Sequence, residues 1–271
     1  MGGKKTDIKF IYNEPALILT ESGKNRLVVG DLHIGVEREF KWKGINMRSA
    51  TEMIANRIVG IASSFKANDL IILGDLKNRI LRLDYAEVRM VKSFLEQLND
   101  SGLRVHLAIG NHDAYTGDFS GLLNGMSDEI IIGDIALMHG HRWPSDKAMS
   151  KGTIITAHNH FAIGIYDSNG AFYNSKVWLV AKANRKELAK RYENGRATRL
   201  IVMPAFNDLI MGGGFDIEHS AREDINPLFR NGIFDFDNAE IYGLDGAFIG
   251  RAADVLRMQR RNGPKIRKRR A

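Results

Sequence analysis

The chain has 271 residues, of which 44% are hydrophobic, and it contains no cysteine. This length and composition fit a globular protein of one large or two small domains, and the lack of cysteine excludes disulfides, thiolate metal sites and a cysteine nucleophile. No stretch approaches the roughly eighteen apolar residues that cross a bilayer, and residues 1–5 lead into a short strand. We therefore expect a cytoplasmic protein without membrane contact.

The net positive charge belongs to the end of the chain. The formal charge is +7, and residues 256–271 hold eight cations and no acid, so the rest of the chain carries about −1. The cations are Arg257, Arg260, Arg261, Lys265, Arg267, Lys268, Arg269 and Arg270. This segment lacks sustained apolar periodicity, which predicts a single domain over residues 1–255 and a disordered basic tail over residues 256–271. The tail is either a solubilising end or an arm that binds the phosphates of a nucleic acid.

The first half of the chain alternates strands and helices. Apolar runs predict a hairpin at 8–12 and 16–19 and buried strands at 26–30, 69–73 and 105–109. Helical spacing of apolar residues predicts helices over 48–65, with Ser49 or Thr51 as its cap, and over 84–99. This alternation is typical of crossover units around a parallel sheet.

The second half of the chain contains mostly short strands. They are predicted at 129–132, 135–138, 153–157, 162–166, 177–180 and 200–203, with one helix at 185–192 and a final hairpin of 241–244 and 247–249. This pattern predicts a second, largely antiparallel sheet. Residues 205–233 form a long irregular segment, which in a compact domain is usually a functional lid or a mobile loop.

Five short polar stretches each follow an apolar strand, and six of the eight histidines lie within them. They are Gly30-Asp31-Leu32-His33, Gly74-Asp75, Gly110-Asn111-His112-Asp113, His139-Gly140-His141 and Ala157-His158-Asn159-His160. Taken singly, each polar residue could be a helix cap, a turn residue or a core histidine. Together they supply carboxylates, an amide and imidazoles, which are the ligands of two adjacent divalent ions of the manganese, iron or zinc type.

These motifs, in this order, resemble the calcineurin-like metallophosphoesterase superfamily, whose pattern runs GDxH, GDxx, GNHD, HG and GHxH. The resemblance covers residues 26–166 and implies a four-layer α/β/β/α sandwich of two mixed sheets flanked by helices. It implies that one metal is held by Asp31, His33 and His160, that the other is held by Asn111, His139 and His158, and that Asp75 bridges them. Ala157 stands where the last motif normally has glycine, and alanine fits there unless the position needs a positive φ.

A narrower resemblance is to the archaeal and bacterial ICC-like phosphoesterases, whose bacterial members accompany a DNA ligase and a helicase. It is carried by the early hairpin, by Gly74-Asp75-Leu76-Lys77 and by Met203-Pro204-Ala205-Phe206-Asn207. Those relatives often carry histidine after the lysine, where this chain has Asn78, so a substrate role at that position is in doubt.

The resemblance implies a dinuclear phosphodiesterase that uses a metal-activated hydroxide, with His112 as general acid and Asp113 orienting its ring. Manganese is the first expectation for the metals, with iron, zinc or nickel as alternatives. His141 is expected to contact a ligand residue and not the metal. The cations Arg38, Lys41, Lys77 and Arg79 either bind flanking phosphates or form a solvated basic loop.

Three functions remain in competition. The first is a nuclease or exonuclease acting on DNA or RNA, which would suit a role in DNA repair. The second is hydrolysis of small phosphodiesters or phosphomonoesters, such as cyclic nucleotides. The third is a non-catalytic scaffold, which we disfavour because no ligand of the pattern is missing. The sequence does not predict the oligomeric state.

Overall fold

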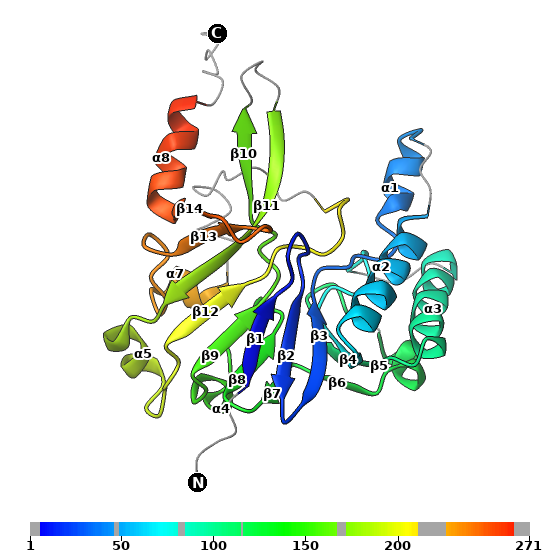
Figure 1. Cartoon of the computed structure of the whole chain (residues 1–271), viewed down its shortest axis with the longest axis horizontal. Helices are drawn as coiled ribbons and strands as arrows, with labels where there is room; N and C mark the ends of the chain where they lie inside the picture. The colour runs from blue at the N-terminus through cyan, green and yellow to red at the C-terminus, as the bar shows by residue number, and fades with distance from the viewer. Residues whose placement is uncertain are drawn as a thin grey trace.

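The computed structural model describes residues 6–45, 49–80, 85–114, 116–166, 172–210 and 226–262. The described strands form two mixed sheets that pack face to face, with helices on the outer side of each sheet (Figure 1). This arrangement confirms the predicted α/β/β/α sandwich. Among the described helices, none is long and apolar enough to cross a membrane.

The first sheet has six strands within the described residues, in the order β1-β2-β3-β4-β5-β6. Their bounds are β1 (Asp7–Phe10), β2 (Leu17–Glu21), β3 (Lys24–Val29), β4 (Ala67–Leu73), β5 (Arg104–Ala108) and β6 (Gly125–Ser127). The first three strands pair antiparallel, and β3 to β6 pair in parallel. The parallel strands β3, β4 and β5 therefore end at the same edge of the sheet.

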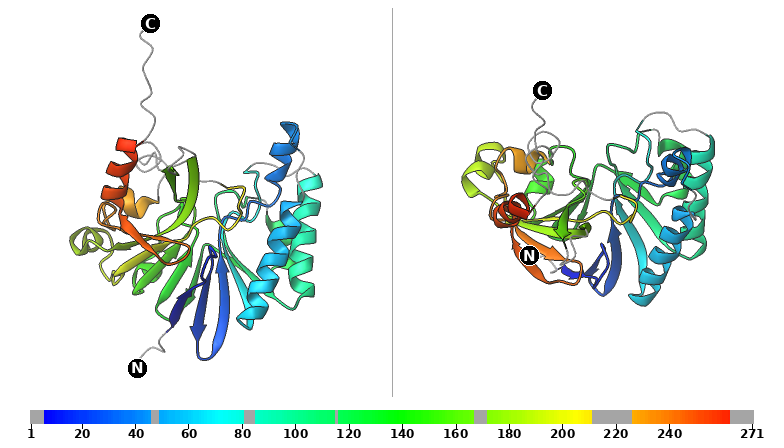
Figure 2. Two further views of the ribbon diagram at one scale, coloured as in Figure 1. Left: turned by 45° about the horizontal axis from the view of Figure 1, so that its top comes forward. Right: turned by 90° about the horizontal axis from the view of Figure 1, so that it is seen from above.

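Two long helices connect these parallel strands and cover the outer face of the first sheet (Figure 2). Helix α2 (Ala50–Ser64) begins after Ser49, whose hydroxyl accepts a hydrogen bond from the Glu52 backbone N–H at 3.4 Å. This is the predicted cap, and the Ser49-to-Glu52 spacing has the form of a capping box. Helix α3 (Tyr85–Asp100) buries Val91, Leu95 and Leu98, which recur at helical spacing.

The second sheet has eight strands, counting described residues only, in the order β14-β13-β11-β12-β9-β8-β7 with β10 beside β11. Their bounds are β7 (Glu129–Ile132), β8 (Ile135–Met138), β9 (Thr153–Thr156), β10 (Ala162–Tyr166), β11 (Phe172–Lys182), β12 (Arg199–Val202), β13 (Glu240–Gly243) and β14 (Phe248–Arg251). Most described pairings are antiparallel, as predicted, but β8–β9 and β9–β12 are parallel. The carboxyl ends of β8 and β9 therefore also lie together.

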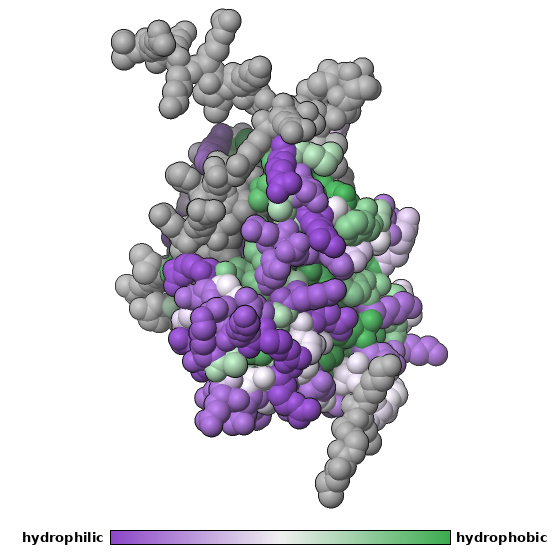
Figure 3. All heavy atoms as spheres, turned by 90° about the vertical axis from the view of Figure 1, so that its left-hand side faces the viewer, coloured by the Kyte–Doolittle hydropathy of each residue, from purple (hydrophilic) through white to green (hydrophobic). Residues whose placement is uncertain are grey.

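Shorter helices cover the outer face of the second sheet (Figure 2). They are α5 (Arg185–Arg191), α7 (Pro227–Arg230) and α8 (Ala252–Asn262). Seen from the side that these helices cover, the described surface is dominated by hydrophilic residues with smaller hydrophobic areas between them (Figure 3). Between the two sheets lies a hydrophobic core that includes Leu19, Leu73, Leu137 and Trp178, each at most 1% exposed.

The structure corrects the predicted start of the tail. Helix α8 continues to Asn262, and its residues Ala252 and Val255 are buried against the second sheet layer. Residues 256–262, predicted to be disordered, are therefore helical because the helix that contains them has an apolar face to bury. Residues 263–271 lie outside the described residues. Residues 211–225 of the predicted loop of 205–233 also lie outside the described residues. The later part of that predicted loop contains helix α7.

Candidate metal centre

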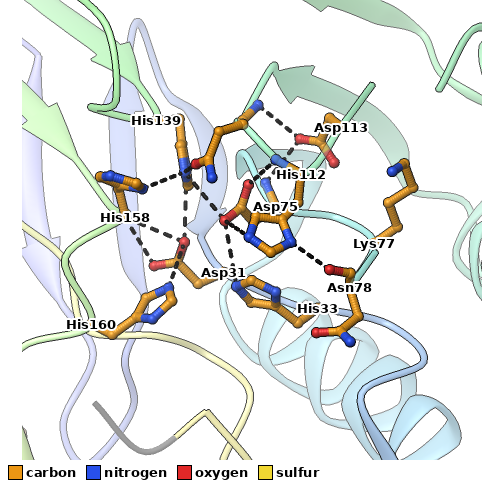
Figure 4. A network of polar contacts seen from close by, with 12 residues as sticks. Asp31, His33, Asp75, Lys77, Asn78, His112, Asp113, His139, His158 and His160 are labelled. Carbon is orange, nitrogen blue, oxygen red and sulfur yellow. Dashed lines mark hydrogen bonds and ion pairs between the residues drawn. The ribbon is translucent and has the colours of Figure 1, made fainter. Parts of the chain in front are cut away.

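All five polar motifs converge on one edge of the sandwich (Figure 4). They follow β3, β4, β5, β8 and β9, and the carboxyl ends of these strands meet there. Ligands in open α/β sheets bind beyond such strand ends, because the loops that leave the sheet can direct side chains to a common point. On this side of the sheets, α1 (Glu37–Trp42) and the β10–β11 hairpin project beyond the other strands (Figure 1).

A first group of side chains comprises Asp31, His33, Asp75 and His160, whose candidate ligand atoms lie within 4.8 Å of one another. His160 Nε2 is 3.3 Å from Asp31 Oδ1, and His33 Nε2 is 3.4 Å from Asp75 Oδ2. Both carboxylates are almost completely buried, at 0% and 1% exposure. Buried carboxylates facing imidazoles in this way are suited to hold a cation.

A second group comprises Asp75, His139 and His158. His139 Nε2 lies 3.3 Å from Asp75 Oδ2, 3.0 Å from His158 Nδ1 and 2.9 Å from the side-chain oxygen of Asn111. The other ring nitrogen, His139 Nδ1, is 2.8 Å from the Leu73 carbonyl, which accepts from it, so Nε2 is the nitrogen directed at the cluster. Side-chain atoms of Asp75, Asn111 and His158 thus all approach His139 Nε2, and Asp75 is common to both groups.

The backbone holds these residues in an uncommon conformation. Five of the candidate ligand residues have positive φ: Asp31 (55°), His33 (43°), Asp75 (51°), His158 (74°) and His160 (47°). Such left-handed geometry is costly for residues other than glycine and tends to persist at functional sites, where the surrounding structure enforces it. Ala157 is not among the positive-φ residues, so alanine fits this position as the sequence predicts.

Two glycines make room for the cluster. A Cβ at Gly74, whose φ is +75°, would overlap the ring of His139, and a Cβ at Gly110 would overlap the Asp75 carboxylate. Glycine is therefore required at both places so that the loops after β4, β5 and β8 can approach one another. The GD and GNHD patterns carry this requirement in their first residue.

Burial and charge set the protonation of the cluster. Burial opposes the charged form of His33 and His158 and lowers the pKa of each to about 4, so both rings are neutral at pH 7. For His139, burial acts in the same direction but is outweighed by the hydrogen bond and charge of Asp75, which raise its pKa to about 9. Although burial opposes it, the neighbouring histidines hold the pKa of Asp75 well below its usual range. The centre therefore offers two carboxylates and at least two neutral imidazoles.

The environment of His112 includes a contact that was not predicted. Its Nδ1 donates to the backbone carbonyl of Asn78, and its Nε2 faces Asp75 Oδ2 at 4.0 Å. The Asp113 carboxylate accepts backbone N–H groups of Asp75 at 2.8 Å, Leu76 at 2.9 Å and Gly110 at 2.8 Å. The backbone carbonyl of Asn78 thus orients the His112 ring, a contact that the sequence does not reveal, and the orienting role of Asp113 stays a prediction.

The remaining predicted site residues are placed around the centre. Lys77 is fully buried and its ammonium donates to the Arg79 carbonyl, a placement that does not suit direct contact with a substrate. His141 lies outside both ligand groups, with its ring 5.2 Å from that of His139. Arg38 belongs to α1 and Arg79 lies near its end, and the guanidinium of each approaches the ring of Trp42.

Two residues near the centre were not predicted from the sequence. Asn207 is buried and its side-chain N–H₂ donates to the carbonyl of Leu32 at 2.7 Å, which fixes the loop between Asp31 and His33. The segment that resembles the narrower phosphoesterase group therefore supports the metal loop. The second residue is Trp42, which is 62% exposed and gave no signal because a lone tryptophan has no motif.

The family model described as calcineurin-like phosphoesterase matches residues 25–203. The chain belongs to the calcineurin-like phosphoesterase family. As a member of this family, it is a metal-dependent hydrolase of phosphoric esters. A search of curated protein sequences gave no match to the chain. The narrower resemblance to phosphoesterases that accompany a DNA ligase stays a prediction.

Solved structures resemble this calcineurin-like phosphoesterase in fold. The nuclease MPE of Pseudomonas putida is 16% identical, with a TM-score of 0.52 over 89% of this chain and 98% of that one. The phosphoesterase Yfce of E. coli is 17% identical, with a TM-score of 0.40 over 83% of this chain and 97% of that one. At such identities the likeness to the nuclease concerns the fold alone.

The residues of the centre fit the divalent metals that calcineurin-like phosphoesterases use. His33 Nδ1 is buried without a hydrogen-bond partner among the described residues, while His33 Nε2 and His160 Nε2 face carboxylate oxygens at 3.4 and 3.3 Å without hydrogen-bond geometry. Unsatisfied buried nitrogens are costly, and a metal ligand is one of the few roles that compensates the cost. Oxygen and imidazole donors without thiolates suit manganese, iron, zinc or nickel.

Proposed function

We propose that this phosphoesterase is a dinuclear phosphodiesterase that hydrolyses the backbone of DNA or RNA. The observation that carries the proposal is the pair of ligand groups that share Asp75. Asp31, His33 and His160 would hold one ion and Asn111, His139 and His158 the other, with Asp75 between them. Two ions bound in this way supply Lewis-acid activation of water and neutralise charge on a phosphate. Manganese is the first candidate metal.

His112 is proposed to protonate the leaving oxygen. Its Nδ1 is engaged by the Asn78 carbonyl, so the ring keeps one orientation and directs Nε2 toward the cluster. In the imidazolium form, Nε2 carries the proton that an alkoxide leaving group requires. The buried Asp113 supports this arrangement indirectly, because it holds the backbones of Asp75 and Leu76.

Several features favour a nucleic acid as the substrate. Arg38 and Arg79 lie next to the loop that carries Asn78, where they can neutralise phosphates on either side of the one that reacts. The basic residues of the tail add charge that could raise the local concentration of a polyanion. The P. putida protein of similar fold is described as a nuclease. A role in DNA repair and a cytoplasmic location remain predictions.

A small phosphodiester, such as a cyclic nucleotide, is the second candidate substrate. A cavity of about 420 Å³ lies beside His139 and is lined by His141, Trp143 and Asp128, among others. Its volume is within the range of pockets that hold small ligands. A nucleoside seated there would place its phosphate toward the metal centre.

The two candidates are separated by substrate assays. The purified chain is treated with a chelator and re-supplied with Mn²⁺, Mg²⁺, Zn²⁺ or Ni²⁺, and is then offered single-stranded DNA, RNA, a cyclic nucleotide and bis(4-nitrophenyl) phosphate. We expect metal-dependent turnover of the oligonucleotides and of the aryl diester. Turnover of the cyclic nucleotide and the aryl diester without any cleavage of oligonucleotides would overturn the nuclease proposal in favour of the second candidate.

A further inference from the structure

An exposed tryptophan ends the short helix that follows the first metal motif. Trp42 is the last residue of α1, and its side chain is 62% exposed, whereas Trp178 in the core is 1% exposed. Two cations lie over it: the guanidinium carbon of Arg38 is 5.4 Å from the Trp42 ring centroid, and that of Arg79 is 5.0 Å. We call these three side chains the aromatic platform. Both cation–π contacts hold the indole in place while most of it stays open to solvent.

The surroundings of the aromatic platform hold more cations than acids, although Arg79 faces the buried Glu87 carboxylate at 4.0 Å. Glu37 is buried and accepts from the Thr51 hydroxyl at 2.7 Å, and Glu39 accepts from the Asn78 side chain at 2.7 Å. The neighbouring lysines, Lys41 and Lys43, are exposed. The exposed residues at this end of α1 therefore include the Trp42 ring, two lysines and one glutamate, Glu39.

The aromatic platform is fixed to the catalytic loops. Asn78 connects them: its side chain donates to Glu39 on α1, and its backbone carbonyl accepts from His112. Arg79 is the next residue along the chain. Helix α1 also begins four residues after His33, and it projects from the sheets on the side where the metal centre lies (Figure 1). A polymer bound at the centre would have its neighbouring units within reach of α1.

We propose that the aromatic platform is a stacking site for an unpaired nucleobase of the nucleic acid held at the metal centre. This inference rests on the proposed nuclease function and specifies it: the substrate would be single-stranded, or locally opened, near the reacting phosphate. Bases stack on tryptophan and on guanidinium planes regardless of their identity, and the adjacent cations bind the backbone. An exposed tryptophan with arginines could also be a contact for another protein. The position of α1 shortly after the first metal motif, and the excess of cations over acids around Trp42, favour the polyanion.

The test measures binding without turnover. The full-length protein, freed of metal with a chelator, is titrated with a single-stranded oligothymidylate. It is also titrated with an oligonucleotide of equal length in which abasic sites replace the bases. Binding is followed by tryptophan fluorescence and, independently, by anisotropy of a dye on the oligonucleotide. The variants are Trp42→Ala, Trp42→Phe and the control Phe248→Ala, which removes a similarly exposed aromatic residue (58%) from β14, away from α1. Thermal melting confirms that each variant is folded.

Stacking predicts a base-dependent loss. Trp42→Ala should weaken binding of the oligothymidylate by roughly 5- to 100-fold, in line with the stacking energy of a single base on an aromatic side chain. It should leave the affinity for the abasic oligonucleotide within about twofold, since the backbone contacts remain. Trp42→Phe should restore most of the affinity but abolish the fluorescence quenching. Phe248→Ala should bind both oligonucleotides as the unchanged chain does.

The outcomes separate the aromatic platform from the nuclease proposal. Equal affinity of the unchanged chain and Trp42→Ala for oligothymidylate would overturn the aromatic platform, and so would an equal loss for both oligonucleotides. In that case Trp42 would be assigned to contact with another protein. The nuclease proposal would be unaffected, because it is tested by oligonucleotide cleavage. Base-dependent binding without cleavage of any oligonucleotide would support the aromatic platform and remove the nuclease function instead.

Discussion

A carboxylate placed between two cations binds both and balances charge on both, and Asp75 occupies this position between the two ligand groups. We predict that Asp75→Asn abolishes turnover and lowers the metal content, because an amide keeps the shape but loses the charge. Metal analysis of the purified variant, together with turnover of bis(4-nitrophenyl) phosphate, tests this. Two metals per chain and normal turnover would show that the dinuclear assignment is wrong.

His112 should respond differently from the ligands. If it is the proton donor, His112→Asn should keep most of the metal yet reduce turnover of an oligonucleotide by roughly 10²- to 10⁴-fold. The loss should be smaller for a nitrophenyl ester, whose leaving group needs little protonation. Steady-state rates on substrates of graded leaving-group pKa measure the difference. An equal loss on all of them would indicate that His112 positions the substrate instead.

At the scale of residues, the sequence predicted functional roles that depend on the identity of a side chain. The seven candidate ligands follow from spaced motifs after strands, and the structure brings their atoms together. The roles that were missed depend on the backbone or on distant contacts. The Asn78 carbonyl orients His112, and Asn207 reaches Leu32 across most of the chain. Neither contact has a local pattern, so neither could have been read from the sequence.

The loops at the strand ends are held together by Asp113. This residue is buried, and burial together with the charge of Asp75 raises its pKa. We predict that Asp113→Ala lowers the free energy of unfolding by roughly 3 kcal/mol or more, because three backbone N–H groups lose a charged acceptor in a buried place. Urea unfolding measures the loss. Asp128→Ala, which removes a 63% exposed carboxylate paired with Arg142, should stay within about 0.5 kcal/mol and serves as the matched control.

Helices whose apolar residues recur at regular spacing were predicted from the sequence, and helices without such spacing were missed. The spans of α2 and α3 differ from prediction by one or two residues at each end, because each has a repeated apolar face. Helix α1 has six residues, too few for a period to show. In α8 the buried residues Ala252 and Val255 precede most of the arginines. The basic residues that follow them therefore led to a prediction of disorder where the structure has a helix. The parallel pairing of β12 with β9 joins distant segments and leaves no local trace.

For the whole molecule, the buried histidines predict that the metal-free protein loses stability on acidification. Burial lowers the pKa of His33 and His158 to about 4 and that of His141 to about 3, against about 6.5 in the unfolded chain. Between pH 6.5 and 4 the unfolded state therefore binds more protons, and stability falls as the pH falls. Asp75, with its lowered pKa, adds stability that is lost only near and below its unfolded value of 3.8, outside this window.

Urea unfolding of the chelated protein at pH 7, 6 and 5 tests this prediction. The midpoint should decrease with each step, and His158→Asn should flatten the decrease by removing one titrating group. The raised pKa of His139, about 9, acts in the other direction: its contribution is complete below pH 6.5 and is lost as the pH rises through 9. A midpoint that stays constant or rises on acidification from pH 7 to 5 would contradict the assigned burial of these rings.

The charged end of the chain supports a prediction about nucleic-acid affinity. Because α8 extends to Asn262, a truncation should remove residues 263–271, which carry five cations, and leave the packed helix intact. If about three of these contact phosphates, the slope of log K against log[salt] for a single strand should become shallower by about 2. Binding of an oligonucleotide at several salt concentrations measures it. An unchanged slope would show that the tail does not take part in binding.

The five left-handed ligand positions determine how a saturation-mutagenesis experiment on this protein should be read. Asparagine, aspartate and histidine are the non-glycine residues that tolerate positive φ best, so the residues that can bind a metal here are also those that the backbone accepts. A valine or isoleucine at Asp31, Asp75 or His158 would fail by misfolding as well as by lost coordination, and a survival screen would merge both defects. A glycine scan separates them, because glycine removes the ligand and still accepts the positive φ of the loop.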